Sequence, residues 1–142
     1  MPAIVAYIDG GARGNPGPAG YGVRIEASGG DVLAELHGAL GIATNNVAEY
    51  YGLLAALRWA IDRGARDVHI RADSELLVRQ MRGEYKVKHP GLQPLYLQAR
   101  ALASQIGHVT LEHVRREQNK EADRLSNLGM DEAEEQIRAA RG

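Results

Sequence analysis

Short apolar and alternating segments recur along the chain and predict β-strands. Residues 3–9 are almost continuously apolar, as in a buried strand, and residues 21–27 alternate between apolar and polar side chains, as in a half-buried one. Ser28-Gly29-Gly30-Asp31 is typical of a hairpin turn, so the next segment is expected to pair back as a third strand. The expected strands cover residues 3–9, 21–27, 32–40, 67–73 and 108–114.

Apolar residues at helical spacing predict four helices. One face of the first helix carries four apolar side chains at this spacing, namely Tyr50, Leu54, Leu57 and Ile61. Gly64 is expected to end this helix, Ser74 to cap the second, and Pro94 to lie in the first turn of the third. The expected helices cover residues 44–63, 74–81, 92–106 and 119–141.

The predicted order βββαβααβα indicates an α/β fold of one domain over residues 1–142. Three antiparallel strands followed by two parallel strands would form a mixed five-stranded sheet flanked by helices. The Gly- and Pro-rich segment from Gly10 to Gly20 is expected to be a shaped turn that stops the first strand. The last helix is expected to break or bend near Gly129, and its acidic end, residues 131–142, to fray.

Composition sets broad limits on location and partners. No apolar run approaches the roughly 20 residues that span a bilayer, so no membrane partner is expected. The absence of cysteine excludes disulfides and thiolate metal sites, and the first residues lead directly into a strand, so a cytoplasmic location is expected. The net charge of −1 gives little support for a large nucleic-acid footprint, but basic residues cluster between positions 79 and 89.

Four carboxylates lie where a strand ends or a helix begins: Asp9, Glu49, Asp73 and Asp123. Each has an ordinary explanation by itself, as a turn residue or as a favourable charge in the first turn of a helix. Strand ends and helix starts can converge on one edge of a sheet, however, and four carboxylates gathered there would repel one another unless a divalent cation held them. The pattern therefore favours a metal-dependent hydrolytic centre.

The motifs around these carboxylates are those of a known family. They are Tyr7-Ile8-Asp9-Gly10-Gly11 with Gly14 to Gly22, Thr44-Asn45-Asn46-Val47-Ala48-Glu49, Ala72-Asp73-Ser74, and Asn119-Lys120-Glu121-Ala122-Asp123-Arg124-Leu125. In this order and spacing, over about residues 3–128, the chain resembles the type 1 ribonucleases H. The match is to a short-loop form without a basic protrusion.

The resemblance implies a ribonuclease H-like fold and a monomer that cleaves the RNA strand of RNA–DNA hybrids. It implies two Mg²⁺ ions with bound substrate, for which Mn²⁺ can substitute, and products with 3′-hydroxyl and 5′-phosphate ends. It makes the four carboxylates the metal ligands, and Asp9, at the end of the central strand, the residue that would bridge both ions. Oxygen ligands of this kind suit hard divalent cations.

The resemblance also implies that Asn15, Asn45 and Asn46 contact the hybrid and that Thr44 contacts a phosphate. Amides and hydroxyls at a helix N-terminus can reach a phosphate and the minor groove, where 2′-hydroxyls mark RNA. The alternative is that they only form turns and helix caps. Gly10 and Gly11 are expected to let the RNA backbone approach the metal site closely.

The chain departs from part of the family in two places. It has only Gly83 to Gly91 where some members carry a longer basic insertion. Four basic residues in and before this loop are candidates for contacts with DNA-strand phosphates, namely Arg79, Arg82, Lys86 and Lys88. The alternative is that they belong to a solvated helix end. It also lacks the loop histidine that many members have before the last helix, since His113 is expected on the preceding strand. Arg116 or Glu117 could take that auxiliary role, or merely cap or form ion pairs.

A rival hypothesis is a non-catalytic nucleic-acid-binding module on the same fold. Such a module would normally have lost one or more of the carboxylates, and all four are present here. Binding without cleavage across a metal titration would favour it.

Overall fold

The computed structural model describes residues 3–142, which form a five-stranded sheet in the order β3-β2-β1-β4-β5. β1 pairs antiparallel with β2 and β2 with β3, whereas β4 runs parallel to both β1 and β5. The mixed sheet and the element order predicted from the sequence are confirmed. The strands are β1 (Ile4–Ala12), β2 (Gly17–Ala27), β3 (Val32–Ala43), β4 (Asp67–Ala72) and β5 (His108–His113).

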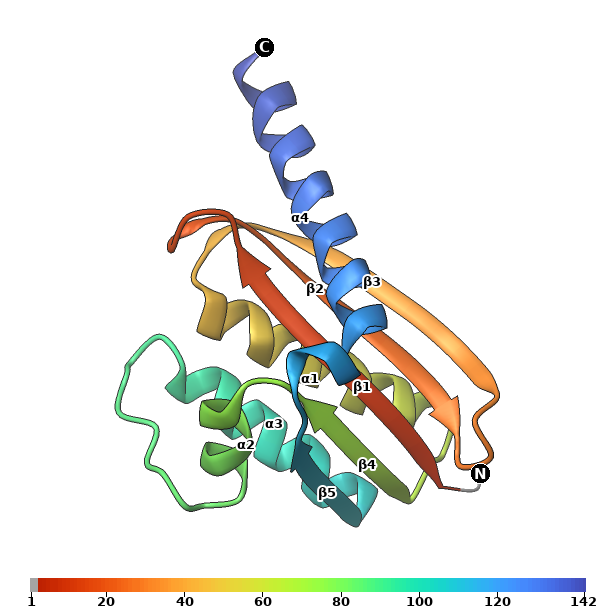
Figure 1. Cartoon of the computed structure of the whole chain (residues 1–142). Coiled ribbons are helices and arrows are strands. Elements are labelled where there is room, and N and C mark those ends of the chain that lie inside the picture. Colours follow the sequence, from red (N-terminus) through yellow and green to blue (C-terminus); the bar gives the residue numbers. More distant parts are fainter. Residues whose placement is uncertain (1–2) are drawn as a thin grey trace.

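Helices cover both faces of the sheet (Figure 1). Three of them lie on one side, where α1 packs against β1 and β2 and α3 packs against α1. The last helix crosses the other face over β1, β2 and β3, and its C-terminal half extends beyond the sheet. The helices are α1 (Asn45–Asp62), α2 (Glu75–Met81), α3 (Gln93–Ile106) and α4 (Lys120–Arg141), with a short 3₁₀ helix η1 (Arg116–Gln118) before α4.

The main core lies between the sheet and α1. It is built from the inward side chains of β1, β2 and β4 and the apolar face of α1, including the fully buried Tyr50, Leu53 and Leu57. The Tyr50 hydroxyl donates a hydrogen bond of 2.8 Å to Gln80 of α2, so this buried polar group is paired. Burying each large apolar side chain contributes about 1.5–3 kcal/mol, which fixes α1 and its first turn against β1. No helix in residues 3–142 is long and apolar enough to cross a membrane.

The first strand does not stop at Gly10-Gly11, and the prediction of a turn from Gly10 to Gly20 was wrong. β1 continues to Ala12 and β2 begins at Gly17, so only four residues connect them. The glycines serve helix packing instead: a Cβ on Gly10 would lie 2.3 Å from the Ala48 carbonyl carbon of α1. Asp9 therefore lies within the central strand rather than at its end.

α4 is continuous through Gly129, so the predicted break did not appear. A Cβ at Gly129 would lie 2.4 Å from the carbonyl oxygen of Gly38 in β3, and this position therefore needs glycine for close contact with the sheet. The acidic end of the chain is helical to Arg141. Arg13 of the β1–β2 hairpin holds this part of the helix through ion pairs of 2.7 Å to Asp131 and 2.5 Å to Glu134.

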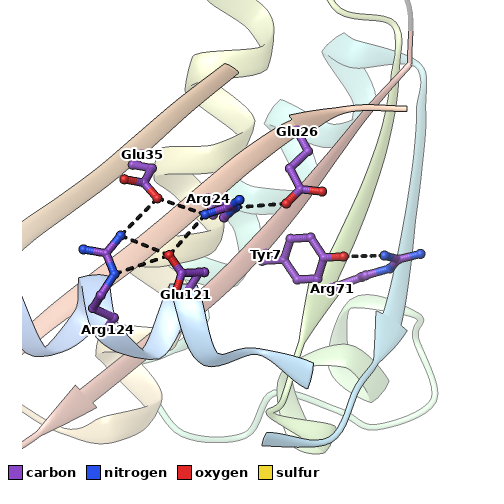
Figure 2. A network of polar contacts seen from close by, with 7 residues as sticks. All are labelled: Tyr7, Arg24, Glu26, Glu35, Arg71, Glu121 and Arg124. Carbon is purple, nitrogen blue, oxygen red and sulfur yellow. Dashed lines mark hydrogen bonds and ion pairs between the residues drawn. The ribbon is translucent and has the colours of Figure 1, made fainter. Parts of the chain in front are cut away.

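A network of ion pairs fastens the first turn of α4 to β2 and β3 (Figure 2). Arg24 of β2 contacts Glu35 of β3 at 3.2 Å and Glu121 of α4 at 3.1 Å. Arg124, one turn further along α4, contacts the same two carboxylates at 3.0 and 3.2 Å. These groups are partly exposed, so each pair adds little stability by itself, but together they fix the lateral position of the helix.

Candidate active site

The fold brings the four predicted carboxylates to one cavity of about 640 Å³. Parallel pairing of Ile8 with Ala72 places Asp9 of β1 beside Asp73, which directly follows β4. Glu49 comes from the first turns of α1, and Asp123 from the first turn of α4 on the opposite face of the sheet. Residues separated by more than 110 positions therefore line one cavity, as the sequence predicted.

Polar contacts surround the Asp9 side chain. The backbone N–H of Gly10 donates to Oδ1 of Asp9 at 2.9 Å, and the Ser126 hydroxyl oxygen lies 3.4 Å from Oδ2. Ser74 caps α2 by accepting a hydrogen bond from the N–H of Leu77, and its hydroxyl lowers the pKa of the Glu49 carboxyl. One serine thus caps a helix and favours the ionised form of a carboxylate of the cavity.

Burial and mutual repulsion disfavour the charged forms of two of these carboxylates. Burial, followed by the charge of Asp73, raises the pKa of Asp9 from 3.8 to about 8, with smaller contributions from Asp123 and Glu49. Burial, again followed by Asp73, raises the pKa of Glu49 from 4.5 to about 7 although the Ser74 hydrogen bond opposes it. At neutral pH the metal-free protein therefore keeps a proton on Asp9, where a cation would favour the ionised form.

The donor set fits a hard divalent cation because it consists of carboxylate oxygens in a partly buried cavity. Within residues 3–142, no three Asp, Glu or His side chains stand close enough together to hold one ion without adjustment. Mg²⁺ does not need such a cage, since it is often bound through one or two carboxylates, with water and substrate oxygens completing its octahedron.

The predicted substrate residues form a connected group beside the carboxylates. The N–H of Asn45 donates to Oδ1 of Asn15 at 3.0 Å, and Oδ1 of Asn45 accepts from the N–H of Ala12 at 2.8 Å. Thr44 caps α1 by accepting from the N–H of Val47 at 3.3 Å, and Asn46 is exposed on the same turn. The cap predicted for Thr44 is thus present, and the asparagine amides of Asn15 and Asn45 have their oxygens engaged within the protein.

Asn45 lines the cavity together with Gly10 and Gly11. The side of Gly10 that would carry a Cβ is filled by the backbone of α1, so this glycine has a packing role independent of substrate. Contact of Gly10 or Gly11 with RNA remains a prediction.

The cavity also contains residues outside the carboxylate set and the predicted substrate contacts. His113 ends β5, the strand on which it was expected, and lines the cavity. The parallel register of Ala72 with His113 places the ends of β4 and β5 at the same edge, and this pairing was the available signal. Arg116 and Glu117 line the cavity as well. The other lining residues without an earlier assignment are Ala12, Arg13, Val114, Arg115, Ser126, Asn127 and Met130.

The four basic candidates differ in their environment. Arg79 contacts Glu75 at 2.8 Å and Glu84 at 3.2 Å, and Arg82 donates to the carbonyl of Leu111 at 2.6 Å. These two side chains are engaged within the fold. Lys86 and Lys88 are both exposed, and neither forms an ion pair or side-chain hydrogen bond with any residue in the range 3–142. The lysines are the better candidates for phosphate contacts.

Comparison with known proteins agrees with this geometry. The family described as "Reverse transcriptase-like" matches residues 7–129. A protein named Ribonuclease HI from Halobacterium salinarum is 41% identical over 130 residues, which cover 92% of this chain and 65% of that protein.

The chain belongs to the type 1 ribonuclease H family.

Two further members of this family extend the comparison. A bifunctional protein of Mycobacterium tuberculosis is 53% identical over 131 residues, and the chain spans only 36% of its length. The solved N-terminal ribonuclease H domain of that protein superposes with a TM-score of 0.92 at 50% identity, covering 96% of this chain and 99% of the solved chain. A compost-derived ribonuclease H1, solved with an RNA/DNA hybrid, gives a TM-score of 0.87 at 43% identity, covering 92% and 98% of the two chains.

Proposed function

We propose that this chain is a metal-dependent endoribonuclease that hydrolyses the RNA strand of RNA–DNA hybrids. The observation that carries the proposal is the convergence of Asp9, Glu49, Asp73 and Asp123 on one cavity. Support comes from family membership and from the related ribonuclease H1 that was solved with a hybrid. A complete carboxylate set also favours catalysis over a non-catalytic binding module on the same fold.

The four carboxylates would hold two Mg²⁺ ions when substrate is bound, and Asp9 would contribute to holding both. Mn²⁺ could replace Mg²⁺ in this role. The ions would supply charge stabilisation for an in-line displacement at phosphorus that leaves 3′-hydroxyl and 5′-phosphate ends. Asp9 and Glu49 must give up their protons for this role. The Gly10 N–H helps to hold Asp9 in place by donating a hydrogen bond to its carboxylate, and Ser74 lowers the pKa of Glu49.

The polar residues at the first turn of α1, beside the cavity, would bind and orient the hybrid. Asn15 and Asn45 use their amide oxygens internally, which leaves their N–H₂ groups as donors for the RNA minor groove. Thr44 and Asn46, on the first turn of α1, are the proposed contacts for phosphate and hybrid. Arg116, Glu117 and His113 line the cavity as well, and we assign them a role in release of the product phosphate.

A cleavage assay on four labelled substrates tests the proposal. The wild-type chain is expected to cut an RNA–DNA hybrid with Mg²⁺ or Mn²⁺, to leave duplex DNA intact, and to lose activity in EDTA. Duplex RNA and a duplex with a single ribonucleotide define the substrate range. Hybrid binding without cleavage at every metal concentration would instead support the non-catalytic module.

Metal-free protein is expected to be more stable at pH 5.5 than at pH 8.5. The folded-state pKa of Asp9 is raised to about 8, so the proton that the folded state retains stabilises it at low pH, and this contribution is lost as the pH rises through about 8. The expected loss is about 2 kcal/mol, less than the full 1.36 kcal/mol per pKa unit because water reaches part of the cavity. Thermal unfolding in EDTA at the two pH values measures it.

An Asp9→Asn variant serves as the control for this pH dependence. It lacks the ionisable group, so its unfolding midpoint in EDTA should change less between pH 5.5 and 8.5 than that of the wild type. Adding Mg²⁺ to the wild-type protein at pH 8.5 should restore the stability that it loses in EDTA, since metal binding favours the ionised carboxylates. An equal pH dependence in both proteins would contradict the raised pKa of Asp9.

Replacing Lys86 and Lys88 together with glutamine is expected to weaken hybrid binding and to reduce its salt dependence. Loss of two phosphate contacts should lower the slope of log affinity against log salt by about 1–2. Fluorescence anisotropy at several salt concentrations measures the slope. The matched control is Arg63→Gln with Arg66→Gln, two exposed charges at the opposite end of β4, for which the slope should stay at the wild-type value.

A further inference from the structure

Two buried polar side chains of the α4 region, Asn119 and Ser126, reach toward β1 beside the cavity. Each is 1% exposed, which is unusual for polar residues that carry no charge partner. They lie on either side of Asp123 in the sequence, and their contacts lead to Asp9 and to the residue that precedes it. Neither belongs to the carboxylate set.

Asn119 occupies the position before α4, where asparagine commonly caps the helix with its side chain. Here it makes no such cap. Its Nδ2 instead donates a hydrogen bond of 2.9 Å to the carbonyl oxygen of Ile8 in β1. The backbone carbonyl oxygen of Asn119 accepts a hydrogen bond of 3.0 Å from the N–H of Asp123. One residue therefore joins the strand position next to Asp9 to the backbone of Asp123.

Ser126 makes a second connection between the same two carboxylates. Its hydroxyl donates a hydrogen bond of 2.8 Å to the carbonyl oxygen of Asp123, and the same oxygen lies 3.4 Å from Oδ2 of Asp9. Ser126 also lines the cavity. Asp9 and Asp123 are thus linked through Asn119 at the start of the first turn and through Ser126 at its end.

We propose, on the basis of the function proposed above, that Asn119 and Ser126 are positioning residues that set the separation of Asp9 and Asp123 for metal binding. The two carboxylates belong to different elements, a strand and a helix, and their charges repel. The ion pairs around Arg24 and Arg124 tie α4 to β2 and β3, not to β1 (Figure 2). The two buried side chains supply polar ties to β1 itself.

The local cost of this arrangement supports a functional reason for it. α4 begins without a side-chain cap, and Oδ1 of Asn119 is buried without a hydrogen-bond partner in residues 3–142. Buried polar atoms are nearly always paired, and local rules are broken mainly where function requires it. A side chain that served only to start the helix would have capped it.

The test combines Mn²⁺ binding by calorimetry with hybrid cleavage kinetics on the full chain. Ser126→Ala removes only a hydroxyl and keeps a good helix former, and Asn119→Asp keeps the shape but replaces the Nδ2 donor. In both variants the dissociation constant for Mn²⁺ is expected to rise about tenfold and kcat to fall about tenfold, as for other residues that orient metal ligands. The KM for the hybrid should stay within about twofold of the wild-type value, because neither side chain is a substrate contact.

Leu125→Ala is the matched control, because Leu125 is buried on the same helical turn and its apolar side chain forms no hydrogen bond. It should lower the unfolding temperature while leaving Mn²⁺ affinity unchanged. The proposal is overturned if Asn119→Asp and Ser126→Ala bind Mn²⁺ like the wild type, or if Leu125→Ala weakens binding equally. A wild-type chain that binds Mn²⁺ but does not cut hybrid contradicts the proposed function alone, and the Mn²⁺ titration still decides the positioning roles. A wild-type chain that does not bind Mn²⁺ overturns both.

Discussion

An Asp9→Asn variant is expected to cleave an RNA–DNA hybrid about 1,000-fold more slowly than the wild-type chain, or slower still. Asp9 lies in the central strand and is the carboxylate that feels the charges of Asp73, Asp123 and Glu49 together. An amide keeps the shape but removes the negative charge and one oxygen ligand. The fold should be unharmed, because asparagine resembles the protonated form that the metal-free protein prefers at neutral pH.

Single-turnover cleavage with excess enzyme measures this effect, and Mn²⁺ should not restore the rate. Asp67→Asn is the matched control, since Asp67 begins β4 at the opposite edge of the sheet and is exposed. It should cleave at the wild-type rate. Cleavage by Asp9→Asn at a rate close to that of Asp67→Asn would show that the carboxylate set does not carry the reaction.

The largest effect on stability is expected for Gly22→Ala in β2. A Cβ at this position would lie 2.4 Å from both the carbonyl oxygen of Ala122 and the backbone nitrogen of Ser126, so α4 would have to move away from the sheet. Backbone atoms cannot rotate aside as a side chain can. The variant is expected to lose about 3 kcal/mol of unfolding free energy and to unfold roughly 10 °C lower.

Urea and thermal unfolding measure this loss. Gly29→Ala provides the control, because a Cβ added there meets nothing within 4 Å. Its unfolding midpoint should equal that of the wild type or exceed it slightly. Gly22→Ala should also cut hybrid more slowly, since displacement of α4 moves Asp123. Wild-type stability of Gly22→Ala would mean that α4 does not rest directly on β2.

Much of the fold could be predicted from local signals. Alternation and continuous apolar runs located the strands, and helical spacing with Thr44 and Ser74 as caps located α1 and α2. The prediction of a turn from Gly10 to Gly20 was wrong because glycine has two structural roles that cannot be told apart in a sequence. It permits turns, and it permits a helix backbone to approach a strand.

The sequence by itself determined the carboxylates of the proposed site, because these residues and their flanking motifs are properties of residue type and spacing. The tertiary structure alone decided which other side chains lie beside them. His113 lies at the cavity because of the parallel register of β4 and β5. Arg79 and Arg82 form ion pairs and hydrogen bonds within the fold. The Asn119 side chain donates to β1 and does not cap α4. Each of these outcomes depends on contacts between residues far apart in the chain, which no local pattern encodes.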